Sequence, residues 1–117
     1  MTTFLNLREQ NIVRCREGYR KQLSDWTLLE WAGAAAGEMG EAANIAKKLR
    51  RIDGGFPGNA GEPSRELLVR ELGREIADVV VYLDLLAAAA GLPDLGVLTA
   101  SKWNEISERI GSPLRLS

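Results

Sequence analysis

The chain has 117 residues, a length that predicts a single domain, 1–117, with a modest hydrophobic core. Apolar residues make up 45% of it and the formal net charge is −1, which argues against disorder and against a nonspecific nucleic-acid binder. The one cysteine, Cys15, cannot form an internal disulfide or a cysteine-based zinc site. The absence of histidine excludes serine–histidine and cysteine–histidine catalysis, so any chemistry would depend on carboxylates, lysines, arginines or a metal.

The cellular location follows from the same composition. The chain does not open with a charged segment followed by an apolar run, so we expect no signal peptide. The longest mostly apolar stretch, residues 79–92, contains Asp84 and is too short to cross a bilayer. We therefore expect a cytoplasmic protein that does not enter the membrane and keeps Cys15 as a reduced thiol.

The hydrophobic pattern predicts four helices and no strand. The first is expected over residues 5–23, where apolar residues recur at intervals that suit one helix face: Leu5, Ile12, Cys15 and Tyr19. The second is expected from residue 27 to about residue 51, because Thr27 and Glu30 have the spacing of a capping box. Alanines dominate the apolar stripe of this helix, which indicates a close approach to a neighbouring helix.

Residues 52–63 hold four glycines and two prolines, so we expect a long loop there. Because proline suits the first turn of a helix, the third helix is expected to begin at residue 63 or 64. It should end near residue 90, where Gly91 is a natural stop. A fourth helix is expected from residue 93 or 94 to residue 111. The predicted fold class is all-α, a four-helix bundle.

Two pairs of acidic residues lie on the second and third expected helices. Glu38 and Glu41 form the first pair, and Glu75 and Asp78 form the second. Each pair is spaced i, i+3, which places both of its carboxylates on one side of the helix. At about 100° per residue, both pairs lie beside the apolar stripe and not opposite it. The two pairs can therefore converge across a helix interface.

Converging carboxylates point to a metal site. One such pair alone is usually a surface charge pair, but two pairs on adjacent helices repel one another unless cations neutralise them. Oxygen-only ligands select a hard metal such as Mg²⁺ or Mn²⁺. Magnesium usually completes its shell with water and substrate phosphates, so we expect a diphosphate or triphosphate substrate. A ferritin-like di-iron site needs Glu-x-x-His motifs, which a chain without histidine cannot supply.

The two acidic motifs, Glu38-x-x-Glu41 and Glu75-x-x-Asp78, resemble the signature of the MazG-like nucleotide pyrophosphohydrolases of the all-α NTP pyrophosphatase superfamily. The resemblance runs from about residue 26 to residue 114. It includes residues 37–44, 47–48, 78–82 and 102–104, together with Arg109. The first motif of the family often reads Glu-Glu-x-x-Glu, whereas this chain has glycine at the leading position, residue 37.

The resemblance implies a MazG-like bundle. The short chain and the alanine-rich stripes of the second and third helices predict that homo-oligomerisation completes it, at least as a homodimer, and the resemblance adds a homotetramer. It implies a hydrolase that converts (deoxy)nucleoside triphosphates to the monophosphate and pyrophosphate, in nucleotide-pool housekeeping. Water would attack the α-phosphorus while Mg²⁺ links the carboxylates to the triphosphate. The expected catalytic residues are Glu38 and Glu41. Glu41, Glu75 and Asp78 are expected mainly as metal ligands, and Glu38 as a ligand, as the base that orients water, or as both.

Further residues are candidates for substrate binding, and each has a structural alternative. Four lie near the acidic pairs on the second and third helices: Trp31, Asn44, Lys48 and Tyr82. Trp31 either stacks on a nucleobase or packs in the core, and Lys48 either contacts phosphate or complements the helix dipole. The resemblance adds phosphate or sugar contacts on the fourth helix, where composition alone indicates a solvated face: Lys102, Asn104 and Arg109.

Two alternatives to this function stay open. Within the same fold, the chain could be a dUTP/dCTP-type pyrophosphatase or a phosphoribosyl-ATP pyrophosphohydrolase. From another class, it could be a catalytically silent nucleotide-sensing or helical interaction module. The intact acids favour an enzyme, because a site that has lost its activity has no need of four clustered carboxylates.

Overall fold

The structure is a computed structural model that describes residues 1–56, 61 and 63–117. This part of the chain is all-helical, which confirms the all-α part of the predicted fold class. Its elements follow in the order α1 (Phe4–Gly18), a short 3-10 helix η1 (Leu23–Asp25), α2 (Leu28–Asp53), α3 (Arg65–Ala89) and α4 (Leu95–Arg109). Residues 57–60 and 62 of the predicted loop lie outside the described residues.

The prediction that the first helix reaches residue 23 is wrong, because α1 ends at Gly18. Beyond that glycine, Arg20 takes a left-handed backbone conformation with φ 52°, which a helix cannot continue through. The Lys21 N–H then donates to the Cys15 carbonyl at 3.0 Å and closes the helix end. The segment that follows forms η1 and turns the chain toward α2.

The other helix ends follow the local sequence. Thr27 caps α2, and its Oγ1 atom accepts from the Glu30 N–H at 3.2 Å, the backbone half of the predicted capping box. Ser64 caps α3 in the same way, with Oγ accepting from the Leu67 N–H at 3.3 Å. Gly91, at φ 73°, follows the end of α3 in the conformation that glycine adopts without strain. The predicted bounds of α2 and α3 are therefore confirmed to within about two residues.

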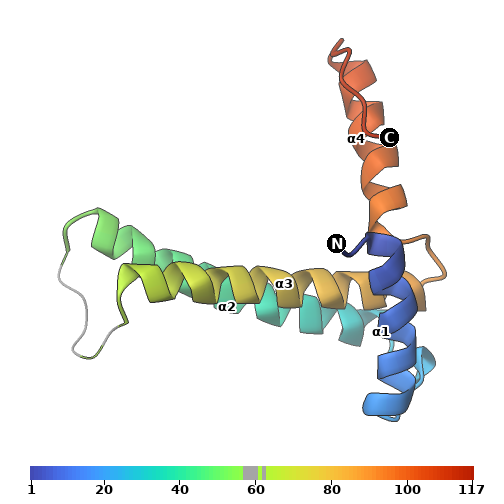
Figure 1. Ribbon diagram of the computed structural model, residues 1–117, viewed down its shortest axis with the longest axis horizontal. Coiled ribbons are helices and arrows are strands. Elements are labelled where there is room, and N and C mark those ends of the chain that lie inside the picture. The colour runs from blue at the N-terminus through green and yellow to red at the C-terminus, as the bar shows by residue number, and fades with distance from the viewer. Residues whose placement is uncertain (57–60, 62) are drawn as a thin grey trace.

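The long helices α2 and α3 lie side by side as an antiparallel hairpin (Figure 1). Two separate hydrophobic clusters hold them together. Near one end, Cys15, Trp31 and Leu85 form a buried cluster to which α1 also contributes. Near the loop end, the buried side chains are Ile45, Leu49 and Leu68. The stretch of hairpin between the clusters contains the four predicted metal ligands.

A buried polar network fixes α1 across the end of α3. Asp84 is fully buried, and Arg8 Nε donates to its Oδ1 atom at 3.0 Å. The same guanidinium donates to the carbonyls of Leu92 at 2.7 Å and Pro93 at 2.9 Å, just before α4 begins. Asn11 Nδ2 donates to Asp84 Oδ2 at 2.9 Å. One carboxylate therefore links α1, α3 and the turn into α4.

The chain is more extended than a compact domain. Its radius of gyration is 17.7 Å, whereas a compact chain of this length has about 13 Å. Helix α4 contacts α1 and α3 near its first residues and then projects away from the hairpin (Figure 1). Large apolar side chains stay exposed on both parts, among them Leu28, Leu29, Met39, Ile76, Leu83, Val97 and Ile110. Among the described helices, none combines the length and the apolar character that crossing a bilayer requires.

Candidate metal centre and adjoining cavity

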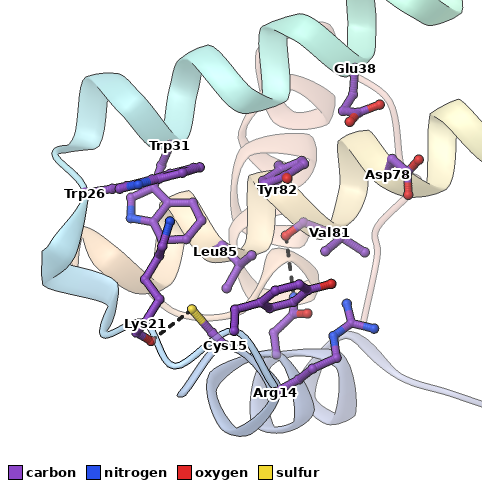
Figure 2. Close-up of a pocket in the computed structure, with 12 residues that line it drawn as sticks. Arg14, Cys15, Lys21, Trp26, Trp31, Glu38, Asp78, Val81, Tyr82 and Leu85 are labelled. Carbon is purple, nitrogen blue, oxygen red and sulfur yellow. Dashed lines mark hydrogen bonds between the residues drawn. The ribbon is translucent and has the colours of Figure 1, made fainter. Parts of the chain in front are cut away.

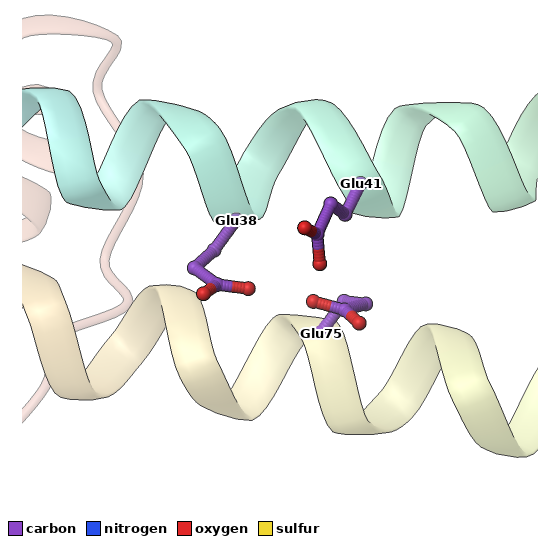
Figure 3. Close-up of side chains that lie close together, drawn as sticks. All are labelled: Glu38, Glu41 and Glu75. Carbon is purple, nitrogen blue, oxygen red and sulfur yellow. The ribbon is translucent and has the colours of Figure 1, made fainter.

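Three of the four predicted ligands converge midway along the hairpin. Glu38 and Glu41 project from α2, and Glu75 projects toward them from α3 (Figure 3). One carboxylate oxygen of each lies within 4.8 Å of those of the other two. The spacing of three residues puts Glu38 and Glu41 on one face of α2, and the antiparallel packing brings Glu75 opposite them. The sequence prediction of convergence is confirmed for these three residues.

The cluster is electrostatically unfavourable when nothing neutralises it. A hydrogen bond shared with Glu75, together with the negative charge of Glu75, raises the pKa of Glu41 above its ordinary value of 4.5. The pKa of Glu75 is also raised, first by a hydrogen bond with Glu38 and then by partial loss of water. Two carboxyl groups can share a hydrogen bond only when one of them carries a proton. A cation bound among the carboxylates would offset their mutual repulsion.

The donor set suits magnesium. The Glu75 Oε2 atom is shielded from solvent and has no hydrogen-bond donor among the described residues. An acceptor oxygen in that position gains a partner when a cation binds. The site offers carboxylate oxygens alone, which is the chemistry that Mg²⁺ and Mn²⁺ prefer. The residues present therefore fit the metal that the sequence implies.

Asp78 lies at the edge of this cluster. It follows Glu75 by one turn of α3 and does not belong to the group of three whose oxygens lie within 4.8 Å. Its charge nevertheless acts on the cluster, because it contributes to the raised pKa of both Glu41 and Glu75. Asp78 also lines a cavity that it shares with Glu38 (Figure 2). Direct metal ligation by Asp78 stays a prediction.

The cavity has a volume of about 400 Å³ and is lined by α1, the segment leading into α2, α2 itself and α3. Pockets that bind small molecules are typically about 300–1,000 Å³. One end is aromatic, with Trp26, Trp31 and Tyr82 on its walls, and the other end reaches Glu38 and Asp78 (Figure 2). A single hollow thus joins apolar rings to the acidic cluster.

The aromatic end is held rigidly. Trp31 is 2% exposed, and its Nε1 atom donates to the Leu23 carbonyl at 2.9 Å. The rings of Trp26 and Trp31 lie 4.5 Å apart between centroids, and those of Trp31 and Tyr82 lie 6.5 Å apart. Lys21 Nζ lies 3.6 Å from the centroid of the Trp26 ring. Trp31 therefore packs in the core and lines the cavity at the same time, so both of the expected roles are compatible with its position.

The other predicted substrate-binding residues divide into two groups. Tyr82 is on the cavity wall, whereas the exposed Asn44 and the half-buried Lys48 lie on α2 beyond the acidic cluster, away from the cavity lining. The second group is on α4, which projects away from the hairpin (Figure 1). Within one chain, the structure does not bring α4 to the acidic cluster.

Two of the three α4 candidates have partners within their own chain. Lys102 Nζ lies 3.4 Å from Glu105 Oε1 in an exposed ion pair. Asn104 Nδ2 donates to the Leu116 carbonyl at 2.9 Å, and its Oδ1 accepts from the Leu116 N–H at 2.7 Å. The amide of Asn104 therefore holds the C-terminal tail along α4. Arg109 is exposed in the last turn of α4.

Sequence reasoning missed the wall that α1 and the following segment contribute to the cavity. Asn11, Arg14, Tyr19, Lys21 and Trp26 all line it. A signal for Asn11 was present in the sequence. It lies four residues before Cys15 on the buried face of α1, a position where a polar side chain needs a partner. That partner, Asp84, interrupts an otherwise apolar run on α3.

The raised pKa values predict an unusual pH dependence. An acid whose pKa is higher in the folded state favours folding when protonated. In a chelator, the free energy of unfolding should therefore rise as pH falls through the raised pKa values toward the ordinary value of 4.5. The chain has no histidine to add its own titration near neutral pH. The pKa of Asp53 is lowered by its hydrogen bond with Arg65, so Asp53 affects stability only at lower pH.

Urea unfolding at several pH values measures this dependence. Glu41→Gln should flatten it, because the substitution removes one of the two groups with a raised pKa. Saturating Mg²⁺ should reverse its sign, since protons then compete with the metal for the same oxygens. A metal-free protein that loses stability steadily as pH falls from 7 to 5 would contradict the clustering.

The geometry of this site is the basis for its functional interpretation. The cluster of Glu38, Glu41 and Glu75 adjoins a cavity with an aromatic far end. Comparison of the chain with protein-family models, with curated proteins and with solved structures finds no match.

Proposed function

We propose that the protein is a Mg²⁺-dependent nucleotide pyrophosphohydrolase of the MazG-like type. It would convert nucleoside triphosphates to the monophosphate and pyrophosphate. One observation carries the proposal: a single cavity extends from aromatic side chains to the acidic cluster, and Glu38 belongs to both. A nucleotide has the matching composition, with a flat ring at one end and phosphates that bring a divalent cation at the other.

The roles of the residues follow from their positions. Glu41 and Glu75 face each other across the hairpin and would hold the cation, with Asp78 adding negative charge beside them. Glu38 lies where the cluster meets the cavity, so its carboxylate would orient water toward the α-phosphorus. When bound, Mg²⁺ supplies neutralisation of phosphate charge and lowers the pKa of water. Trp31 and Tyr82 would position the base and keep water from that end of the cavity.

The active form is proposed to be a homodimer or a homotetramer. The extended shape of the chain and its exposed apolar side chains support this, because one chain leaves these surfaces unburied. A second copy would also account for α4, whose predicted phosphate contacts lie far from the acids of their own chain (Figure 1). Lys102 and Arg109 would then act on the site of a neighbouring copy.

A nucleotide panel tests the proposed function. The purified protein is incubated with the common NTPs and dNTPs in Mg²⁺, and pyrophosphate and orthophosphate are measured separately. Pyrophosphate released together with the nucleoside monophosphate supports the proposal. Orthophosphate released with the diphosphate would show cleavage at a different bond. Binding of nucleotides without turnover would instead favour a catalytically silent sensor.

A further inference from the structure

Asn11 is a polar side chain inside the core that also faces the cavity. It is 3% exposed, and it lines the cavity wall that α1 contributes. The cavity has acidic groups at one end and aromatic rings at the other, so a polar group fixed in its wall can distinguish one flat ring from another. What Asn11 presents to a ligand depends on which way its amide is turned.

Asp84 determines that orientation. Asn11 Nδ2 donates to Asp84 Oδ2 at 2.9 Å and lies 3.5 Å from the Val81 carbonyl oxygen. Both of these neighbours are acceptors, so the NH₂ group must face them, and the opposite orientation would set three oxygens against one another. Arg8 holds the other oxygen of Asp84 at 3.0 Å, which keeps the carboxylate in place. The amide of Asn11 is therefore locked.

Because Asp84 and Val81 hold its NH₂ group, the locked amide leaves its oxygen as the polar atom available to the cavity. No described residue donates a hydrogen bond to Asn11 Oδ1, and this atom is not sealed from solvent. Since Asn11 lies on the cavity wall and is almost wholly buried, what remains accessible of it is accessible from the cavity. The wall thus presents a fixed acceptor with an unused lone pair and no donor hydrogen.

We propose that Asn11 Oδ1 selects nucleobases that carry an exocyclic amino group over the same ring with an oxo group in its place. This inference takes one premise from the proposed function, which is that the ligand is a nucleotide. An amino group donates to the acceptor, as on cytosine or adenine. The oxo group of uracil or hypoxanthine would meet it oxygen to oxygen, and both acceptors would lose their water without gaining a hydrogen bond.

Three other polar side chains on the wall of α1 and the segment after it are less able to make this distinction. Arg14 and Tyr19 are exposed, and Lys21 lies over the ring of Trp26. Long or exposed side chains can reorient toward whichever partner a base offers. The amide of Asn11 cannot do so, because turning it would break its bond to a buried carboxylate. Asn11 is therefore the specificity-determining residue, and Asp84 is the residue that positions it.

Two pairs of nucleotides that differ at one substituent test the proposal. With Mg²⁺ present, kcat/KM for pyrophosphate release is measured for dCTP against dUTP and for dATP against dITP. In whichever pair is hydrolysed faster, kcat/KM should be about tenfold or more higher for the nucleotide that carries the amino group. This is the effect expected when one buried acceptor is left without a hydrogen bond. The comparison uses the unaltered protein, so it does not depend on any variant folding.

A substitution at Asp84 gives a sharper result. Asp84→Asn keeps the shape of the side chain and leaves one oxygen to accept from Arg8, so its new NH₂ group faces Asn11. The Asn11 amide should then turn and present its own NH₂ group to the cavity, which reverses the preference to dUTP over dCTP. Asn11→Leu should abolish the preference without reversing it. A merely structural role of Asp84 would lower turnover of both nucleotides equally.

Failure of this inference is separable from failure of the proposed function. Binding of the α,β-imido analogues of dCTP and dUTP, measured by calorimetry, reports the preference without any turnover. Hydrolysis with equal kcat/KM within both pairs, or with the oxo member preferred, would overturn the inference and leave the hydrolase intact. A preference for the imido-dCTP analogue without hydrolysis of any nucleotide would retain the inference and overturn the hydrolase. Equal binding of both analogues would overturn the inference in either case.

Discussion

Glu75→Gln should lower kcat/KM for pyrophosphate release by at least about 100-fold. Even residues that only support metal ligands cost about 10- to 100-fold when they are replaced, and a ligand should cost no less. Glu75 is the strongest choice because it is the α3 member of the cluster and its Oε2 atom lacks a donor. Initial rates across a range of Mg²⁺ concentrations measure the effect, and excess metal should restore little of the activity.

Two comparisons separate chemistry from folding in this experiment. Glu66→Gln makes the same change of charge in the first turn of α3, outside the cluster, and should leave the rate within about twofold. In a chelator, the Glu75→Gln protein should unfold at a urea concentration no lower than the parent, because the substitution removes repulsion. Full activity in Glu75→Gln would exclude a catalytic metal at this cluster.

Asp84→Ala should cost about 3–5 kcal/mol of folding stability, the largest loss that we expect from any single substitution in the chain. The change removes a fully buried carboxylate and leaves two groups without their partner: the Arg8 guanidinium, which is 13% exposed, and the Asn11 amide. Chemical denaturation followed by circular dichroism measures the loss. Arg8→Ala in the Asp84→Ala background should cost less than Arg8→Ala alone, because the guanidinium is then no longer paired.

An exposed ion pair of similar geometry provides the contrast. Arg65 Nε lies 2.8 Å from Asp53 Oδ1, but the two side chains are 56% and 50% exposed. Water already solvates both groups, so Arg65→Ala should cost about 1 kcal/mol or less. Equal losses from Arg65→Ala and Asp84→Ala would mean that burial does not decide the strength of the network.

The sequence predicted best those features that depend on residues close together in the chain. The N-cap at Thr27 and the stop at Gly91 follow from local backbone chemistry, and both are confirmed. The convergence of Glu38, Glu41 and Glu75 was predictable for a related reason. Helix periodicity fixes each acid relative to an apolar stripe, and the two stripes must face each other in any packed hairpin.

Features that depend on distant parts of the chain were harder to predict. The left-handed Arg20, which shortens α1, has no strong signature in the sequence, because an arginine in that conformation is held by its surroundings. The α1 wall of the cavity depends on a contact between Asn11 and Asp84, which are 73 positions apart. The direction of α4 depends on how Arg8 holds the turn at Leu92 and Pro93.

The separation of the two hydrophobic clusters has a consequence for how such a protein can evolve. The residues that hold the hairpin together lie toward its two ends, and the acids lie between them. Substitutions among the acids can therefore alter the proposed metal site while the folded state persists. Substitutions in the cluster near the loop, which does not line the cavity, change stability alone, whereas Trp31 in the other cluster also lines the cavity. In a two-helix scaffold of this kind, substitutions among the acids between the clusters therefore carry a low risk of unfolding.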